Sequence, residues 1–118
     1  MITNYMVLFC VLLMTVSCGA RQQYDITIEN VGDETIDDAH VIFEGFYSIG
    51  GIIPPGREAT NLRPNHRLPE VVLVQWQTED YVLHKKIIKI DLPPKFKGDI
   101  RFKIGAQEKV TVQYIPWD

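Results

Sequence analysis

Residues 71–77 read Val-Val-Leu-Val-Gln-Trp-Gln, and this stretch decides the fold expected for the whole chain. Three valines, a leucine and a tryptophan within seven residues are typical of a strand at the centre of a β-sheet, because β-branched and aromatic side chains pack well on a pleated surface. Residues 78–80 follow as a turn. The isoleucine-rich stretch 82–90 then predicts a second strand, which Pro93 and Pro94 end.

The same alternation of apolar and polar residues continues on both sides of this stretch. It is clearest at residues 24–29 and at residues 99–104. After position 20, no apolar stripe with the period of a helix runs for ten residues or more. The expected strands cover residues 24–29, 39–44, 58–62, 71–77, 82–90, 99–104 and 110–115. Seven to eight short strands with regular turn signals predict an all-β fold, and a two-sheet sandwich rather than a barrel.

Three local features make the chain similar to immunoglobulin-like β-sandwich modules. They are the turn Asn30-Val31-Gly32 after the first strand, Pro55-Gly56 before a short strand, and Trp76 on a central strand. The layout also resembles small bacterial lipoproteins of the Gram-negative type. The resemblance implies one immunoglobulin-like β-sandwich over residues 24–118.

Composition limits the classes of function. The chain has 118 residues, 46% of them hydrophobic, which fits a single domain with a core of its own. Its net charge of −3 and the lack of a basic face make binding to nucleic acid improbable.

The first 16 residues carry no charged side chain, and residues 6–16 are almost continuously apolar. A run of this length is too short to cross a bilayer, which needs about 20 residues, but it matches the apolar core of a signal peptide. Cys18 ends the run after Thr15-Val16-Ser17 and is followed by Gly19-Ala20. This arrangement resembles the lipobox of bacterial lipoproteins, although Thr15 stands where that family usually has leucine.

The lipobox resemblance implies that residues 1–17 are removed and that Cys18 receives lipid. Residues 18–23 then form a short tether, and several acyl chains give stable anchoring in a membrane. By the same resemblance, Gly19 implies the periplasmic face of the outer membrane. The alternative is ordinary cleavage after Ala20, which releases a soluble periplasmic protein.

The residue types that usually carry out catalysis are thinly spread. His40, His66 and His84 lie on separate segments, and no two have the spacing of a metal site. Ser48 lacks the G-x-S-x-G pattern of a nucleophile elbow. The acidic residues between 33 and 38 lack the order of a Ca²⁺ loop, and solvated carboxylates are the simpler interpretation. No metal, cofactor or catalytic activity is therefore predicted.

Residues 45–56 form the least regular segment and contain several large apolar side chains. In one interpretation these side chains cap the sandwich or form a third, buried strand. In the other they form an exposed contact patch, together with polar and aromatic residues from two other segments. The candidate patch consists of Phe46, Tyr47, Ile49, Ile52, Ile53, Arg63, His66, Arg67 and Trp117.

Taken together, these features predict a membrane-anchored, non-catalytic binding module with a protein partner in the cell envelope. It would act as an accessory subunit of a larger assembly or as an immunity-type protein. The alternative is a glycan-binding module or an accessory to an envelope hydrolase. A hydrolase would need two carboxyl groups facing one cleft.

Overall fold

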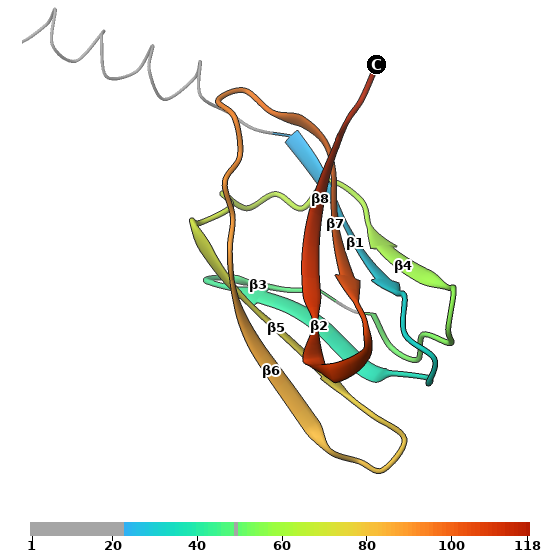
Figure 1. Cartoon of the computed structure of the whole chain (residues 1–118). Helices are drawn as coiled ribbons and strands as arrows, with labels where there is room; N and C mark the ends of the chain where they lie inside the picture. Colours follow the sequence, from blue (N-terminus) through green and yellow to red (C-terminus); the bar gives the residue numbers. More distant parts are fainter. Residues whose placement is uncertain (1–22, 49) are drawn as a thin grey trace, which may run out of the picture.

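The computed structural model describes residues 23–48 and 50–118, which form eight strands and one short 3-10 helix (Figure 1). The elements are β1 (Gln23–Asn30), β2 (Asp37–Phe43), β3 (Phe46–Tyr47), β4 (Glu58–Asn61), β5 (Val71–Gln77), β6 (Leu83–Lys89), β7 (Lys97–Ile104), η1 (Ala106–Glu108) and β8 (Val110–Pro116). The predicted signal peptide and Cys18 lie outside the described residues. No helix among the described residues is long and apolar enough to cross a membrane.

The strands form two four-stranded sheets, ordered β4-β1-β7-β8 and β3-β2-β5-β6, which pack face to face. The predicted all-β sandwich is therefore confirmed. Each of the seven expected strands is present, and β5 spans residues 71–77, as predicted, between β2 and β6. The eighth strand, β3, is two residues long and lies in the irregular segment.

β1 and β7 run parallel and pair along their whole length, from Gln23 beside Lys97 to Asn30 beside Ile104. The other strand pairs of both sheets are antiparallel. Successive side chains of a strand point to opposite faces, so this register sets the inward residues of both strands side by side. Ile28 thus lies beside Phe102 in the core, both fully buried, while Thr27 lies beside Arg101 on the outer face.

The order of the strands is immunoglobulin-like in most of the domain. In immunoglobulin constant domains, strands C, F and G form one sheet, and strands B and E are neighbours in the other. Here β2, β5 and β6 occupy the places of C, F and G, and β1 and β4 those of B and E. The place beside B, which strand A fills in those domains, is taken by β7 from the end of the chain.

The sandwich has two ends, which we name by the course of β1. The entry end is where β1 and β7 begin and β8 finishes. The far end carries four connections: residues 31–36, 78–82 and 105–109, which follow β1, β5 and β7, and residues 54–57, which precede β4. Connections that are distant in sequence therefore come together at the far end (Figure 1).

Gly98 allows β7 to pass close to β8 at the entry end. A Cβ atom at this position would lie 2.3 Å from the carbonyl oxygen of Ile115 and 2.8 Å from the ring of Phe96. At Gly105 the corresponding nearest contact is 3.5 Å, which is ordinary van der Waals distance. We expect Gly98→Ala to lower the free energy of unfolding by about 1–3 kcal/mol because of overpacking.

Gly105→Ala is the matched control and should change stability by less than about 1 kcal/mol, since the φ of Gly105 is −115°. Urea unfolding of both variants measures the difference. Equal effects of the two substitutions would contradict the close approach of β7 and β8.

Tyr24, at the start of β1, is 2% exposed and donates its phenolic hydrogen to the carbonyl oxygen of His66. Burial raises the pKa of Tyr24 to about 12, whereas a tyrosine in an unfolded chain ionises near pH 10. The neutral side chain therefore contributes stability that is complete below pH 10 and is lost as the pH rises through about 12.

Tyr24→Phe should lower the free energy of unfolding by about 1 kcal/mol at pH 7, because the hydrogen bond to His66 is lost. The gap to wild type should close as the pH rises above 10, because the variant has no phenol to ionise. Urea unfolding from pH 7 to 11.5 tests this, with the exposed Tyr47→Phe as control. A gap that does not depend on pH would disprove the assignment.

Candidate functional site

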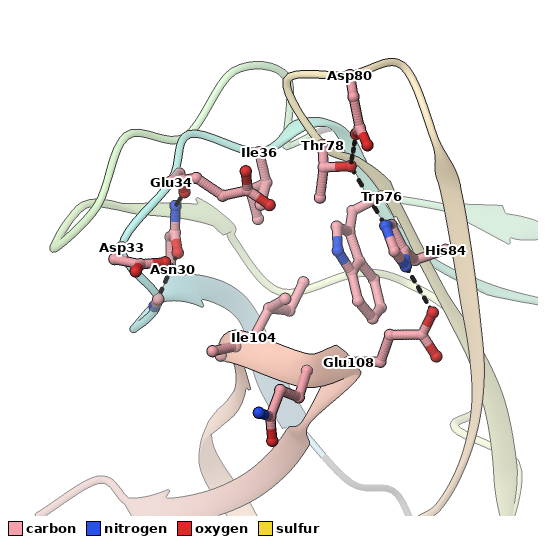
Figure 2. A pocket seen from close by; sticks show the side chains of 14 residues that line it. Asn30, Asp33, Glu34, Ile36, Trp76, Thr78, Asp80, His84, Ile104 and Glu108 are labelled. Atoms are coloured by element: carbon pink, nitrogen blue, oxygen red, sulfur yellow. Dashed lines mark hydrogen bonds and ion pairs between the residues drawn. The ribbon is translucent and has the colours of Figure 1, made fainter.

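A pocket of about 400 Å³ opens at the far end, between the two sheets (Figure 2). Its walls come from the end of β1, the β1–β2 connection, the β5–β6 turn with the adjacent ends of its strands, and the β7–β8 connection. Pockets that bind small ligands measure about 300–1,000 Å³. The far end therefore has a cavity of the size needed to hold a ligand or one side chain of a partner.

The floor of the pocket is apolar except for one atom. Ile36, Trp76 and Ile104 line it, and each is at most 3% exposed. The indole nitrogen of Trp76 is turned toward the cavity (Figure 2). Among residues 23–48 and 50–118, no acceptor takes a hydrogen bond from this N–H. A nearly buried tryptophan thus presents a free donor to whatever fills the pocket.

One wall of the pocket consists of polar side chains that contact one another, and one of them, His84, stacks on Trp76. The ring of His84 stacks on the indole with 5.4 Å between centroids and 12° between planes. Its Nδ1 lies 2.7 Å from Oε1 of Glu108, and its Nε2 lies 3.3 Å from Oγ1 of Thr78. Thr78 donates to Asp80 and thereby lowers the pKa of that carboxyl group.

The opposite wall depends on the buried side chain of Asn30, which is 1% exposed. Its Nδ2 donates to the carbonyl oxygens of Glu34 at 2.7 Å and Ile53 at 2.9 Å, and its Oδ1 accepts from the N–H of Gly32 at 3.0 Å. These three bonds fix residues 31–36 against the body of the domain. The carboxylates of that connection are thereby placed on the rim of the pocket.

The far end carries a strong negative charge. Residues 31–38 contain four carboxylates, residues 78–82 two and residues 105–109 one, and all seven are exposed. Lys109 is the single basic residue in these three segments, and the exposed Arg57 lies in the connection before β4, beside Asn30. Just outside them, the amino group of Lys86 donates to the carbonyl oxygen of Glu108 at 3.3 Å. The excess of carboxylates creates a field that attracts positively charged groups.

No group of three or more His, Cys, Asp or Glu residues within the described part of the chain is placed to hold a metal ion. The buried Ser48 accepts a hydrogen bond from the N–H of Val41 through its Oγ, at 2.6 Å. The ring of His40 contacts the carbonyl oxygen of Ser48 instead of its hydroxyl group. The Ser48 hydroxyl is therefore occupied by the backbone and does not face a base.

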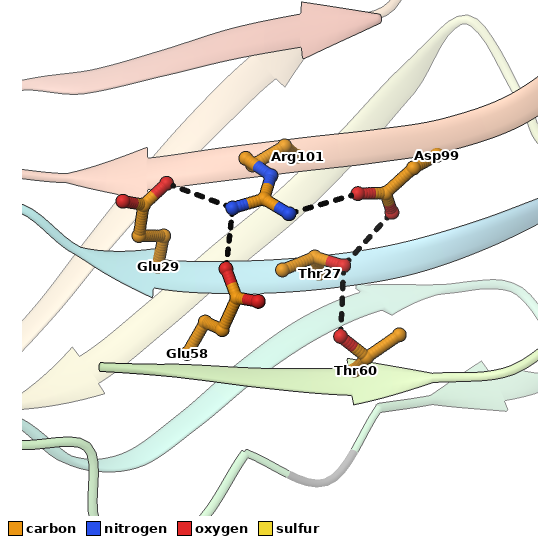
Figure 3. A network of polar contacts seen from close by, with 6 residues as sticks. All are labelled: Thr27, Glu29, Glu58, Thr60, Asp99 and Arg101. Carbon is orange, nitrogen blue, oxygen red and sulfur yellow. Dashed lines mark hydrogen bonds and ion pairs between the residues drawn. The ribbon is translucent and has the colours of Figure 1, made fainter. Parts of the chain in front are cut away.

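A second polar cluster lies on the outer face of the β4-β1-β7-β8 sheet (Figure 3). The guanidinium of Arg101 contacts Glu58, Glu29 at 3.2 Å and Asp99 at 3.4 Å. Burial alone would lower the pKa of Arg101, but the hydrogen bond to Glu29 and the charges of all three carboxylates raise it above its ordinary value. The cluster joins β4, β1 and β7, so we interpret it as structural.

The hydroxyl groups of two threonines extend this cluster. Thr27, which is 1% exposed, donates to Asp99 at 2.8 Å, and the hydroxyl of Thr60 lies 3.0 Å away. Since the single hydroxyl hydrogen of Thr27 goes to Asp99, Thr60 is the donor to Thr27. The network thus crosses all three strands with each hydroxyl satisfied.

Four residues of the predicted contact patch form two ring contacts toward the entry end. Phe46, half-buried in β3, contacts the ring of exposed His66 with 5.4 Å between centroids. Arg63 lies over the ring of Trp117, at 4.9 Å from its centroid, near the entry end. Tyr47 and Arg67 are exposed, as is Ile52 at 69%.

The structure corrects the prediction for Ile53, which is buried and therefore not part of an exposed patch. It is 2% exposed and pairs with Ile36 through two backbone hydrogen bonds of 3.1 and 2.8 Å. The N–H groups of Ser48 and Gly50 likewise donate to the backbone of β2. The segment thus follows β2 as an irregular edge and turns the Ile53 side chain into the core. Ile49, like the lipidation site Cys18, lies outside the described residues.

The pocket residues were not predicted as a site. Trp76 was expected only on a central strand, His84 only on a segment separate from the other histidines, and the acids after β1 only as solvated side chains. The sequence does show that three separate turns each carry carboxylates. This pattern indicates a binding site only once the strand order is known, because the strand order places these turns at one end of the sandwich.

No protein-family model matches the sequence. A search of curated proteins also finds no match. Among solved structures, the fold is similar to that of a protein from Eubacterium rectale determined by NMR. The TM-score is 0.59 at 14% sequence identity, and the match covers 84% of this chain and 94% of that protein. At this identity the similarity concerns the fold alone.

We expect Asn30→Asp to destabilise the domain by about 1–3 kcal/mol at pH 7, because a carboxylate oxygen would face the carbonyl oxygens of Glu34 and Ile53. Protonation restores a donor, so the pKa of the new carboxyl group is raised in the folded state. The penalty should therefore shrink as the pH falls toward 4. Thermal unfolding between pH 4 and 7 measures this.

Gln113→Glu adds the same charge at an exposed position of β8 and serves as the control. It should show no comparable recovery at low pH. If Asn30→Asp is as stable as wild type at pH 7, the buried amide does not hold the pocket wall.

Proposed function

We propose that this protein is a non-catalytic binding module, held at a bacterial envelope membrane through lipid on Cys18. Its contact surface for a partner protein is the far end of the sandwich. The observation that carries this proposal is the pocket at that end, with a free indole donor on its floor and carboxylates around its rim.

The position of the pocket relative to the start of the domain fits an anchored protein. Four residues, 19–22, separate Cys18 from the first described residue, Gln23, and the five Cα–Cα steps between the two span at most about 17 Å when extended. The eight residues of β1 then lead away from the entry end over roughly 26 Å. An anchor at Cys18 would keep the entry end near the lipid and leave the far end open to the periplasm.

The charge of the far end supports a basic partner. Complementary charge speeds association and rejects partners of the wrong sign. An accessory subunit would use it to position a positively charged component of an envelope assembly. An immunity-type protein would use it to cover the basic surface of a toxin.

Glycan binding is supported less well by the described residues. A glycan platform needs aromatic rings that face solvent, and of Phe46, Tyr47 and Trp117 only Tyr47 is more than half exposed. The ring of Phe46 is partly covered by His66, and that of Trp117 by Arg63. The carboxylates of the pocket rim are exposed to solvent, whereas the acid of a hydrolase sits in a sheltered apolar pocket.

In-cell cross-linking followed by mass spectrometry tests the proposal. We expect one partner protein in near-equal amount with the wild-type chain, and less of it with Cys18→Ser. A far-end variant carrying Asp33→Asn, Glu34→Gln and Asp80→Asn should lose the cross-link at least tenfold.

The matched control removes three exposed carboxylates near the entry end, through Glu44→Gln, Glu70→Gln and Asp91→Asn. This variant should keep the partner. Recovery of glycan fragments without a protein, or equal losses in the two triple variants, would contradict the proposal. Membrane association that is unchanged in Cys18→Ser would contradict the anchor.

A further inference from the structure

We infer that the pocket binds one basic residue of a peptide segment, with the cationic tip at the carboxylate rim and a peptide carbonyl on the Trp76 N–H. This inference rests on the proposed function, because it names the chemistry that the partner must present. It is a statement about the pocket itself and can be tested without knowing the partner.

The first observation is the indole donor on the floor of the pocket. Trp76 is 2% exposed, and its N–H faces the cavity without an acceptor among the described residues. This nitrogen is not sealed from solvent, because Nε of Arg101 is the one buried side-chain N or O atom without a partner in the described part of the chain. A ligand can therefore bring an acceptor to it in place of water, and peptide carbonyl groups are strong acceptors.

The second step is the charge around the mouth. Asp33 and Glu34 lie on one side of the pocket, and Asp80 and Glu108 on the other. Among the residues that line the pocket, His84 is the one basic side chain, against these four carboxylates. The mouth is therefore negative, so it attracts cations and repels phosphate or carboxylate ligands.

The third step is size. A volume of about 400 Å³ corresponds to roughly a dozen water molecules at their volume in the liquid. This is enough for one lysine or arginine side chain with its peptide group. The apolar floor formed by Ile36 and Ile104 suits the methylene groups of such a side chain, which pack on apolar surface while the charged tip stays near water.

The fluorescence of the Trp76 indole can report the binding of a ligand in the pocket. The chain has two tryptophans, and Trp117 lies near the entry end, so Trp117→Phe leaves Trp76 as the sole reporter. We would titrate this full-length chain, in nonionic detergent, with acetyl-Gly-Arg-Gly-amide. The probe for comparison is the same peptide with citrulline, which has nearly the same shape but no charge.

The arginine peptide should change the fluorescence of Trp76 saturably and bind at least tenfold more tightly than the citrulline peptide. Raising the salt from 50 to 500 mM should weaken its binding severalfold, because the interaction is between charges. Glu108→Gln should weaken it about tenfold. Asp91→Asn, an exposed carboxylate near the entry end, is the control and should leave binding unchanged.

Three outcomes would overturn the inference. They are equal binding of the citrulline peptide, binding that is insensitive to salt, and the absence of any response to the arginine peptide. These outcomes are distinguishable from failure of the proposed function. If cross-linking still recovers a partner that depends on the far-end carboxylates, the far end is a contact surface but the pocket does not take a basic residue.

Discussion

The pairing of β1 with β7 is the constraint on which the other parts of this domain depend. β1 is hydrogen-bonded on both edges, to β4 and to β7, so each of its side chains has a fixed neighbour. Its inward residues form the centre of the core, and its outward Thr27 and Glu29 help to hold Arg101. Its last residue, Asn30, fixes one wall of the pocket. A shift of one residue in this register would disturb the core, the polar cluster and the pocket together.

The carboxylates of the molecule fall into two classes. Those on the outer face of the β4-β1-β7-β8 sheet surround a half-buried guanidinium, so much of their charge is compensated. Those at the far end, seven in number, face solvent with few cations near them. Carboxylates whose charge is compensated by a half-buried guanidinium and exposed carboxylates in excess of the nearby cations thus carry different information. Only the second class indicates where a positively charged molecule would bind.

The sequence predicted the elements of this fold better than their arrangement. Alternation at residues 24–29 and 99–104 located β1 and β7, but nothing in the pattern indicated that these strands are parallel neighbours. The contact patch was predicted from composition, and it failed at Ile53 because the alternation of side chains is lost in an irregular segment. Ile52 and Ile53 are equally apolar, yet one is 69% exposed and the other 2%. The pocket escaped prediction because its residues meet only after two sheets have formed.

The pairing of β1 with the distant β7 limits how early in synthesis the domain can fold. Thr27 and Asp99, which are hydrogen-bonded across β1 and β7, are 72 residues apart in the chain. Proteins dominated by such distant pairings fold slowly, because a long loop must close before the contact forms. A chain that emerges from its amino end first therefore cannot complete this sheet until residues 97–104 have also emerged. Until then β1 has no partner on the edge that β7 later occupies, and its side chains belong to an unfolded chain.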